Sequence, residues 1–286
     1  MAASTAALRG ITKQYKDFTL GPVDMTVPAG SIVGLIGENG AGKTTLLKIL
    51  CGVNRADDGT VDLLGGSPAD AATRAKIGVV FEDAFFYGTF TAAQVARSLA
   101  GMYGAQWNAD SFSAYLRRFG LDAGKKLKEY SRGMRLKLSL AAALAHGPEL
   151  LVLDEATAGL DPVVRGDLLD LFLEFIQDER HSIVMSSHIT ADLEQIADSI
   201  AYLHNGQLLF QENKDDLLQE YGVLHCGEDV LTSLPAGLVV FTRRGAYGCE
   251  SLVRERRTVQ ELLPEAVCDA ARLDDIMRFY SGRDAQ

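Results

Sequence analysis

The stretch SIVGLIGENGAGKTTLLKILCG, residues 31–52, decides how the rest of the chain folds. It begins with an apolar run, continues through a glycine-rich turn, and ends with apolar residues at helical spacing that Gly52 closes. This order predicts a buried strand, a tight loop and a helix. The loop has Gly37, then four residues, then Gly42-Lys43-Thr44, and this spacing between a strand and a helix matches the phosphate-binding P-loop.

The loop is predicted to bind Mg²⁺-ATP. Its glycines let successive backbone N–H groups converge on phosphate oxygens, and the following helix directs its positive N-terminal end at the same anion. Lys43 is expected to reach the β- and γ-phosphates, and the Thr44 hydroxyl to ligate magnesium. The residues predicted to contact ATP in this loop are Gly37, Glu38, Asn39, Gly40, Ala41, Gly42, Lys43, Thr44 and Thr45.

The segment LLVLDEATAGLD, residues 150–161, is predicted to complete the nucleotide site. An apolar strand there ends in Asp154, which can hold magnesium directly or through water. Glu155 follows, and a second carboxylate beside the first makes it the candidate general base for the attacking water. The cofactors implied are therefore ATP and Mg²⁺.

Strands and helices alternate along most of the chain, which predicts an α/β fold with a P-loop core. Two β-rich segments before residue 30 predict an N-terminal antiparallel sheet, and residues of about 83–130 predict a helical insert that opens with a capping box at Thr91. Asp161 followed by Pro162 predicts a helix start, and Asn205-Gly206 predicts a hairpin.

The expected domains are an ATP-binding domain over residues 1–221 and a small C-terminal appendage over residues 222–286. The appendage ends in a predicted amphipathic helix with Leu273, Ile276, Met277 and Tyr280 on one face. This face either docks onto the main domain or contacts a partner.

Composition limits the function classes. The chain has 286 residues, 47% of them hydrophobic, and a formal net charge of -10, which argues against a nucleic-acid partner because such binding needs clustered Lys and Arg. We find no apolar run of the roughly 18 residues that a membrane-spanning helix needs, so a soluble, cytoplasmic chain is expected. The four cysteines are too scattered for metal-ligand spacing and are interpreted as buried or incidental thiols.

Two further motifs narrow the interpretation. YSRGM at residues 130–134 precedes the acidic strand, and Ser187-His188 follows the next strand. Together with the P-loop, these motifs resemble the ATP-binding-cassette (ABC) ATPases of membrane transporters over roughly residues 8–215. The form of YSRGM looks most like ATPase subunits of the exporter, or ABC-2-like, branch, which pair with a separate membrane subunit.

The resemblance implies further site residues. Tyr15 would stack on adenine, although a plain strand aromatic is the alternative. Ser131 and Gly133 would contact the γ-phosphate of ATP held by another subunit, so that each site is completed in a homodimer or heterodimer. His188 would hydrogen-bond the γ-phosphate and help to hold the attacking water.

The chain departs from the family pattern at Glu82 and Arg132, and Met134 also stands where the family often has Gln. Glu82 stands where the family usually has Gln, and Arg132 stands where it usually has Gly. A carboxylate is a good ligand for a hard cation, so Glu82 is predicted to ligate magnesium and to link nucleotide state to the helical insert. Arg132 puts the backbone role of the missing glycine in question.

The partner implied by the resemblance is a separate transmembrane permease, which would hold this ATPase on the inner face of the cell membrane and drive export. Aromatic residues follow Glu82 where such a permease docks, and they either form that interface or pack the helical insert: Phe85, Phe86, Tyr87 and Phe90. The alternative function is a soluble ABC ATPase in assembly or regulation. The single P-loop and the absence of a predicted long coiled coil argue against it.

Overall fold

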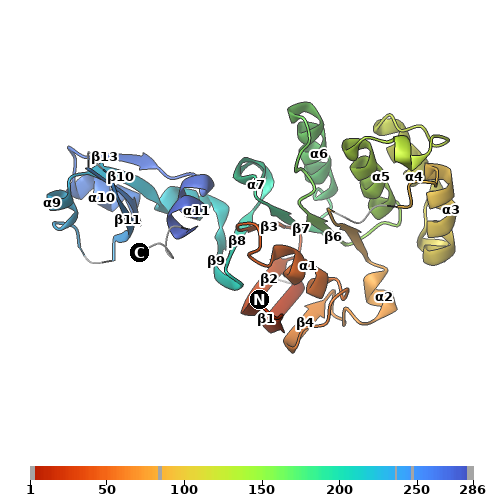
Figure 1. Ribbon diagram of the computed structural model, residues 1–286, viewed down its shortest axis with the longest axis horizontal. Coiled ribbons are helices and arrows are strands. Elements are labelled where there is room, and N and C mark those ends of the chain that lie inside the picture. Colours follow the sequence, from red (N-terminus) through yellow and green to blue (C-terminus); the bar gives the residue numbers. More distant parts are fainter. Residues whose placement is uncertain (1–3, 83–85, 236, 246–247, 282–286) are drawn as a thin grey trace.

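The computed structural model describes residues 4–82, 86–235, 237–245 and 248–281. Its N-terminal part is a three-stranded antiparallel sheet in the order β2-β1-β4 (Figure 1). The strands are β1 (Ser4–Gln14), β2 (Thr19–Pro28) and β4 (Asp58–Leu63). The predicted antiparallel pair is confirmed, and β4 is an unforeseen third strand.

A six-stranded sheet forms the core, in the order β5-β6-β7-β3-β8-β9. The first five strands are parallel and β9 is antiparallel. Asn205 and Gly206 have φ angles of 46° and 80°, so the predicted hairpin between β8 and β9 turns with both central residues in the left-handed region. The strands are β3 (Ile32–Ile36), β5 (Ile77–Val80), β6 (Leu150–Asp154), β7 (Ser182–Ser187), β8 (Ser199–His204) and β9 (Gln207–Asn213).

The P-loop helix α1 (Lys43–Leu50) lies between these two sheets. Its buried residues Leu46, Leu47 and Leu50 share one apolar cluster with residues of β1, β2 and β3. The core sheet is also accompanied by helices α2 (Ala71–Arg74), α5 (Arg132–Leu144), α6 (Pro162–Phe175), α7 (Thr190–Ile196) and α8 (Lys214–Glu220). The N-cap prediction for α6 is confirmed, because the Asp161 carboxylate accepts a hydrogen bond from the Val164 N–H at 3.0 Å.

Helices α3 (Ala92–Tyr103) and α4 (Ala109–Arg118) form the predicted helical insert, which Figure 1 shows beside α5. Both hydrogen bonds of the predicted capping box at Thr91 and Gln94 are present. In the part of the chain that the structure describes, no helix is long and apolar enough to cross a membrane.

The C-terminal region after Tyr221 contains a four-stranded antiparallel sheet in the order β11-β12-β10-β13. The sequence predicted only the last helix of this region and none of its strands. Its elements are β10 (Gly222–Cys226), β11 (Val239–Gly245), β12 (Gly248–Val253), β13 (Val267–Ala270), α9 (Glu228–Leu231), α10 (Arg256–Leu262) and α11 (Leu273–Ser281). Figure 1 shows α11 between this sheet and strands β8 and β9.

Helix α11 docks onto the rest of the chain, as one of the two sequence interpretations held. Ile276, Phe279 and Tyr280 belong to the same buried cluster as Tyr202 of the core sheet. The Tyr280 ring meets Tyr202 edge-on, with 5.7 Å between the ring centroids. The apolar face of α11 is therefore covered within this chain.

The outer strands of two sheets meet at a seam between β2 and β9. The Gly21 N–H donates a hydrogen bond to the carbonyl of Gly206 at 2.7 Å. Further along, the Gln211 side-chain amide accepts from the Thr26 N–H at 3.0 Å and donates to the Thr26 carbonyl at 2.6 Å. One side chain thus satisfies both backbone groups of a residue on the facing strand.

Candidate functional site

The candidate site lies where three neighbouring parallel strands end. Strands β6, β7 and β3 are adjacent in the core sheet, so the loops after their carboxyl ends meet at one edge. A pocket of about 390 Å³ opens there beside the P-loop. It is lined by Tyr15, Phe18, Glu38, Asn39, Gly40, Gly42, Lys43, Thr44, Thr45, Glu82 and Glu155.

Lys43 lies at the centre of this loop with its side chain only 7% exposed. Its ammonium donates hydrogen bonds to the carbonyls of Gly37 at 2.7 Å and Glu38 at 3.2 Å, and it lies 3.3 Å from Oε1 of Glu155. The Lys43 ammonium is therefore held in the pocket by two backbone carbonyls and the Glu155 carboxylate.

Two oxygen ligands for a hard cation lie side by side at the next position. The Thr44 hydroxyl donates to Oδ2 of Asp154 at 2.7 Å, and the buried Ser186 hydroxyl donates to Oδ1 of the same carboxylate at 2.6 Å. Mg²⁺ typically uses one or two carboxylates together with substrate phosphates and water, so this pair of oxygens fits it. Ser186 was not foreseen, although its position directly before Ser187-His188 was a usable signal.

Glu155 and His188 contact each other at the mouth of the site. Nδ1 of His188 lies 2.6 Å from Oε2 of Glu155, whose side chain is 10% exposed. Glu155 has a φ of 52°, a strained value for a residue with a side chain, and its N–H donates to the Ser186 hydroxyl at 3.1 Å. Strain at a carboxylate held toward a phosphate-binding loop is typical of functional positions.

The aromatic side of the pocket contains two rings. Tyr15 is 42% exposed and lies 6.5 Å from the Phe18 ring, centroid to centroid. A Cβ atom added at Gly42 would lie 2.9 Å from Phe18, and Gly42 has a φ of 106°, so glycine is required there. Phe18 was not foreseen, because it belongs to none of the motifs in the sequence that indicate nucleotide binding. A stacking role for Tyr15 stays a prediction.

Ser131 and Gly133 are not among the residues that line the pocket of their own chain. Ser131 caps helix α5, its hydroxyl accepting from the Met134 N–H at 3.2 Å. Between them Arg132 pairs with Glu82, with 2.8 Å from Nη2 to Oε1. The Glu82 carboxylate thus has a partner within the chain. Ligation of magnesium by Glu82 stays a prediction.

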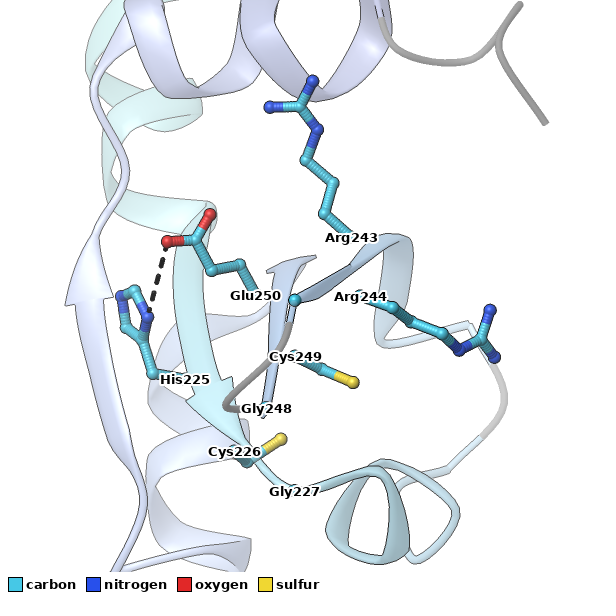
Figure 2. Close-up of a pocket in the computed structure, with 9 residues that line it drawn as sticks. His225, Cys226, Gly227, Arg243, Arg244, Gly248, Cys249 and Glu250 are labelled. Carbon is cyan, nitrogen blue, oxygen red and sulfur yellow. Dashed lines mark ion pairs between the residues drawn. The ribbon is translucent and has the colours of Figure 1, made fainter.

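A second hollow, of about 660 Å³, lies at one end of the C-terminal sheet (Figure 2). His225 faces Glu250 at 3.9 Å there, while Arg244 pairs with Glu228 and Arg243 points toward α11. Its charged side chains do not converge on one point. The described residues also contain no cluster of three or more His, Cys, Asp or Glu side chains suited to a metal. The P-loop pocket is therefore the candidate site.

Comparison with known proteins identifies the class of this site. A family model described as "ABC transporter" matches residues 20–158. An uncharacterised ABC transporter ATP-binding protein of Synechocystis is 38% identical over 206 residues, covering 70% of this chain and 58% of the relative. The bacitracin transport ATP-binding protein BcrA of Enterococcus faecalis is 35% identical, covering 72% and 68%. The lantibiotic transport ATP-binding protein SrtF of Streptococcus pyogenes is 32% identical, covering 73% and 90%.

Solved structures similar to this chain are also ATP-binding proteins of the ABC class. The ATP-binding subunit of an ABC transporter superposes with a TM-score of 0.67 at 28% identity, covering 75% of this chain and 92% of that one. The ATP-binding cassette MJ0796, solved as a dimer bound to ADP and phosphate, shares the fold with a TM-score of 0.66 at 23% identity, covering 73% and 98%.

Proposed function

The chain belongs to the ATP-binding subunits of ABC transporters, and from this premise we propose that it binds and hydrolyses Mg²⁺-ATP to drive export through a separate membrane subunit. One observation carries the proposal: after β3, β6 and β7 the chain brings Lys43 against Glu155, Thr44 against Asp154 and His188 against Glu155, beside the P-loop pocket. The names of the bacitracin and lantibiotic relatives support transport as the process.

The geometry suggests how the residues divide the work. Lys43 would turn from the loop carbonyls to the β- and γ-phosphates, and Thr44 and Asp154 would hold magnesium, which would supply positive charge beside the phosphates. Glu155 then accepts the proton of the attacking water. His188, in contact with Glu155 at 2.6 Å, keeps that carboxylate oriented and donates to the γ-phosphate.

Two copies are proposed to close head to tail on two ATP molecules. Ser131 and Gly133 stand at the start of α5, do not line the pocket of their own chain, and can face the ATP of a second copy. The dimeric MJ0796 cassette, which shares the fold, supports this arrangement. Hydrolysis removes the γ-phosphate between the copies, and the opening moves the membrane subunits.

The membrane subunit is proposed to dock in an apolar hollow of about 340 Å³ bounded by the end of α1 and by α3 and α5. Phe86 lines this hollow, and Tyr87 beside it is 78% exposed. Phe90 is partly buried and packs against the apolar cluster of the helical insert, and Phe85 lies outside the described residues. Phe86 packs against the same insert cluster, so packing accounts for the Phe86 and Phe90 rings, and the permease interface stays a prediction. Docking there would place the chain on the inner face of the membrane.

The experiment is the substitution Glu155→Gln. Because Gln keeps the shape of the side chain but cannot take the proton, ATP binding should persist, turnover should fall by about 10² or more, and a dimer should accumulate with ATP. Turnover is measured by phosphate release and the dimer by sedimentation. Glu149→Gln is the matched control, because Glu149 directly precedes the first residue of β6 and Glu155 directly follows its last. Wild-type turnover in Glu155→Gln would refute the base assignment.

The export partner is tested separately, by purifying the chain from membranes. Recovery with a multi-span membrane protein supports the transporter assignment. Recovery only in a soluble complex would favour an assembly or regulatory ATPase instead. Substituting Tyr87→Ala should weaken the membrane complex without changing the ATPase activity of the isolated chain.

A further inference from the structure

Glu82 and Arg132, both departures from the family pattern, are each other's partners. Glu82 follows strand β5 and Arg132 opens helix α5, and 50 residues of chain separate them. Their charged groups meet at 2.8 Å, with side chains that are 45% and 53% exposed. A carboxylate in place of an amide and a guanidinium in place of a hydrogen atom thus compensate each other's charge.

Arg132 also contacts a third loop. A Cβ atom placed on Gly159 would lie 3.1 Å from Nη1 of Arg132, so the guanidinium rests directly against that glycine. Gly159 has a φ of 70° and lies in the loop that follows Glu155. Arg132 therefore joins the loop after β5 and the loop after β6 to the start of α5.

Glu82 has competing demands. It lines the same pocket as Lys43 and Thr44, so its carboxylate is close to where phosphates and magnesium bind. While it pairs with Arg132, less of its charge is available to a cation. A hard divalent cation with phosphate ligands is a stronger attraction for a carboxylate than a half-exposed guanidinium.

We propose that the Glu82–Arg132 pair is a latch that restrains the start of α5 in the nucleotide-free subunit. Mg²⁺-ATP draws Glu82 toward the metal, and the freed Arg132 then turns to the phosphate of ATP in the second copy. Arg132 is thus a positioning residue with two alternative partners, one in its own chain and one across the dimer. The inference rests on the proposed ATP-dependent dimer. It adds an ion pair that must break before the dimer closes.

The weakness of the pair suits this role. An exposed ion pair shifts an equilibrium by no more than about fivefold, so ATP binding can readily break it. The same limit sets the size of the effect to look for. The variants should also fold normally, because both side chains are about half exposed.

The test is a double-mutant cycle on dimer formation in the full chain, in the Glu155→Gln background and at saturating magnesium. Glu82→Gln removes the latch and leaves Arg132 free, so half-maximal dimerisation should need about two- to fivefold less ATP. In an Arg132→Gly background, Glu82→Gln should give no such gain, because there is no guanidinium to release. Arg132→Lys keeps a cation and should restore the gain.

Controls separate the possible results. Glu228→Gln, which breaks an exposed pair with Arg244 at 2.9 Å on the C-terminal sheet, should leave the ATP requirement unchanged. An equal effect of Glu82→Gln with and without Arg132 would overturn the latch while the dimer stands. Failure of the Glu155→Gln chain to dimerise at any ATP concentration would overturn the proposed dimer, and with it the second partner of Arg132.

Discussion

At the scale of single residues, the site is prepared by hydrogen bonds within the chain. Ser186 is buried and contacts both acidic residues, because its hydroxyl donates to Asp154 and accepts from the Glu155 N–H. The serine thus fixes the proposed metal ligand and the proposed base relative to each other. Residues that hydrogen-bond to a metal ligand strongly influence metal affinity.

Ser186→Ala should therefore weaken the binding of magnesium more than it weakens the binding of ATP in the absence of magnesium. Loss of one hydrogen bond to the Asp154 carboxylate is expected to raise the magnesium concentration for half-maximal ATPase activity by about tenfold. The free energy of unfolding should fall by about 1–3 kcal/mol, since buried polar groups lose a partner. The control is Ser187→Ala, whose hydroxyl bonds the backbone of Ile189 instead. Equal magnesium requirements in the two variants would contradict the role of Ser186.

At the scale of elements, the end of helix α5 is held to strand β5 by His146. Its Nε2 is 3.1 Å from the Ile77 carbonyl, and its ring stacks on Tyr103 with 4.2 Å between centroids. Burial lowers the pKa of His146 from its ordinary 6.5. This ring is therefore kept neutral between helix, strand and insert.

The lowered pKa makes stability depend on pH. Below pH 6.5 the unfolded chain takes up a proton on His146 that the folded chain does not, so this contribution is complete above pH 6.5 and is lost as the pH falls below it. His146→Phe should therefore lose less unfolding free energy than wild type between pH 7.5 and 5.5, measured by urea denaturation. His225→Phe is the exposed control. A loss as large as that of wild type in His146→Phe would contradict the prediction.

Elements with local signals could be predicted from the sequence, and elements paired over long distances could not. Thr91 and Asp161 announce helix starts because their partners lie three residues ahead. Strand β4 and the C-terminal sheet have short, partly polar strands whose pairing depends on distant segments. The P-loop and Asp154 could be predicted for the same local reason, and His188 only through the resemblance to a family. The Glu82–Arg132 pair spans 50 residues, and no pattern predicts it.

At the scale of the whole molecule, one apolar cluster runs from the core sheet into the C-terminal sheet. It contains Phe172 of α6, Tyr202 of β8, Leu252 of β12 and Phe279 of α11. The C-terminal region thus shares buried surface with the region that carries the site. We propose that it stabilises the ATP-binding part rather than forming a separate functional unit.

Phe279→Ala is the test at this scale. Removing a buried aromatic ring should lower the free energy of unfolding by about 3–5 kcal/mol, measured by denaturant titration followed by both fluorescence and ATPase activity. Both signals should shift together, because the cluster is continuous. Leu262→Ala, at a half-exposed position of α10, should cost only about 0.5 kcal/mol. Unchanged stability in Phe279→Ala would contradict the proposal that the C-terminal region stabilises the ATP-binding part.

The seam between β2 and β9 also bears on aggregation. Both are outermost strands of their sheets, and an outer strand with unpaired backbone groups is a template on which another chain can add a strand. Strands β2 and β9 face each other, and the Gln211 side-chain amide bonds both backbone groups of Thr26, as a neighbouring strand would. Each strand therefore covers the exposed edge of the other. The fold thus limits strand-to-strand aggregation along this side while leaving the nucleotide face open to a second copy.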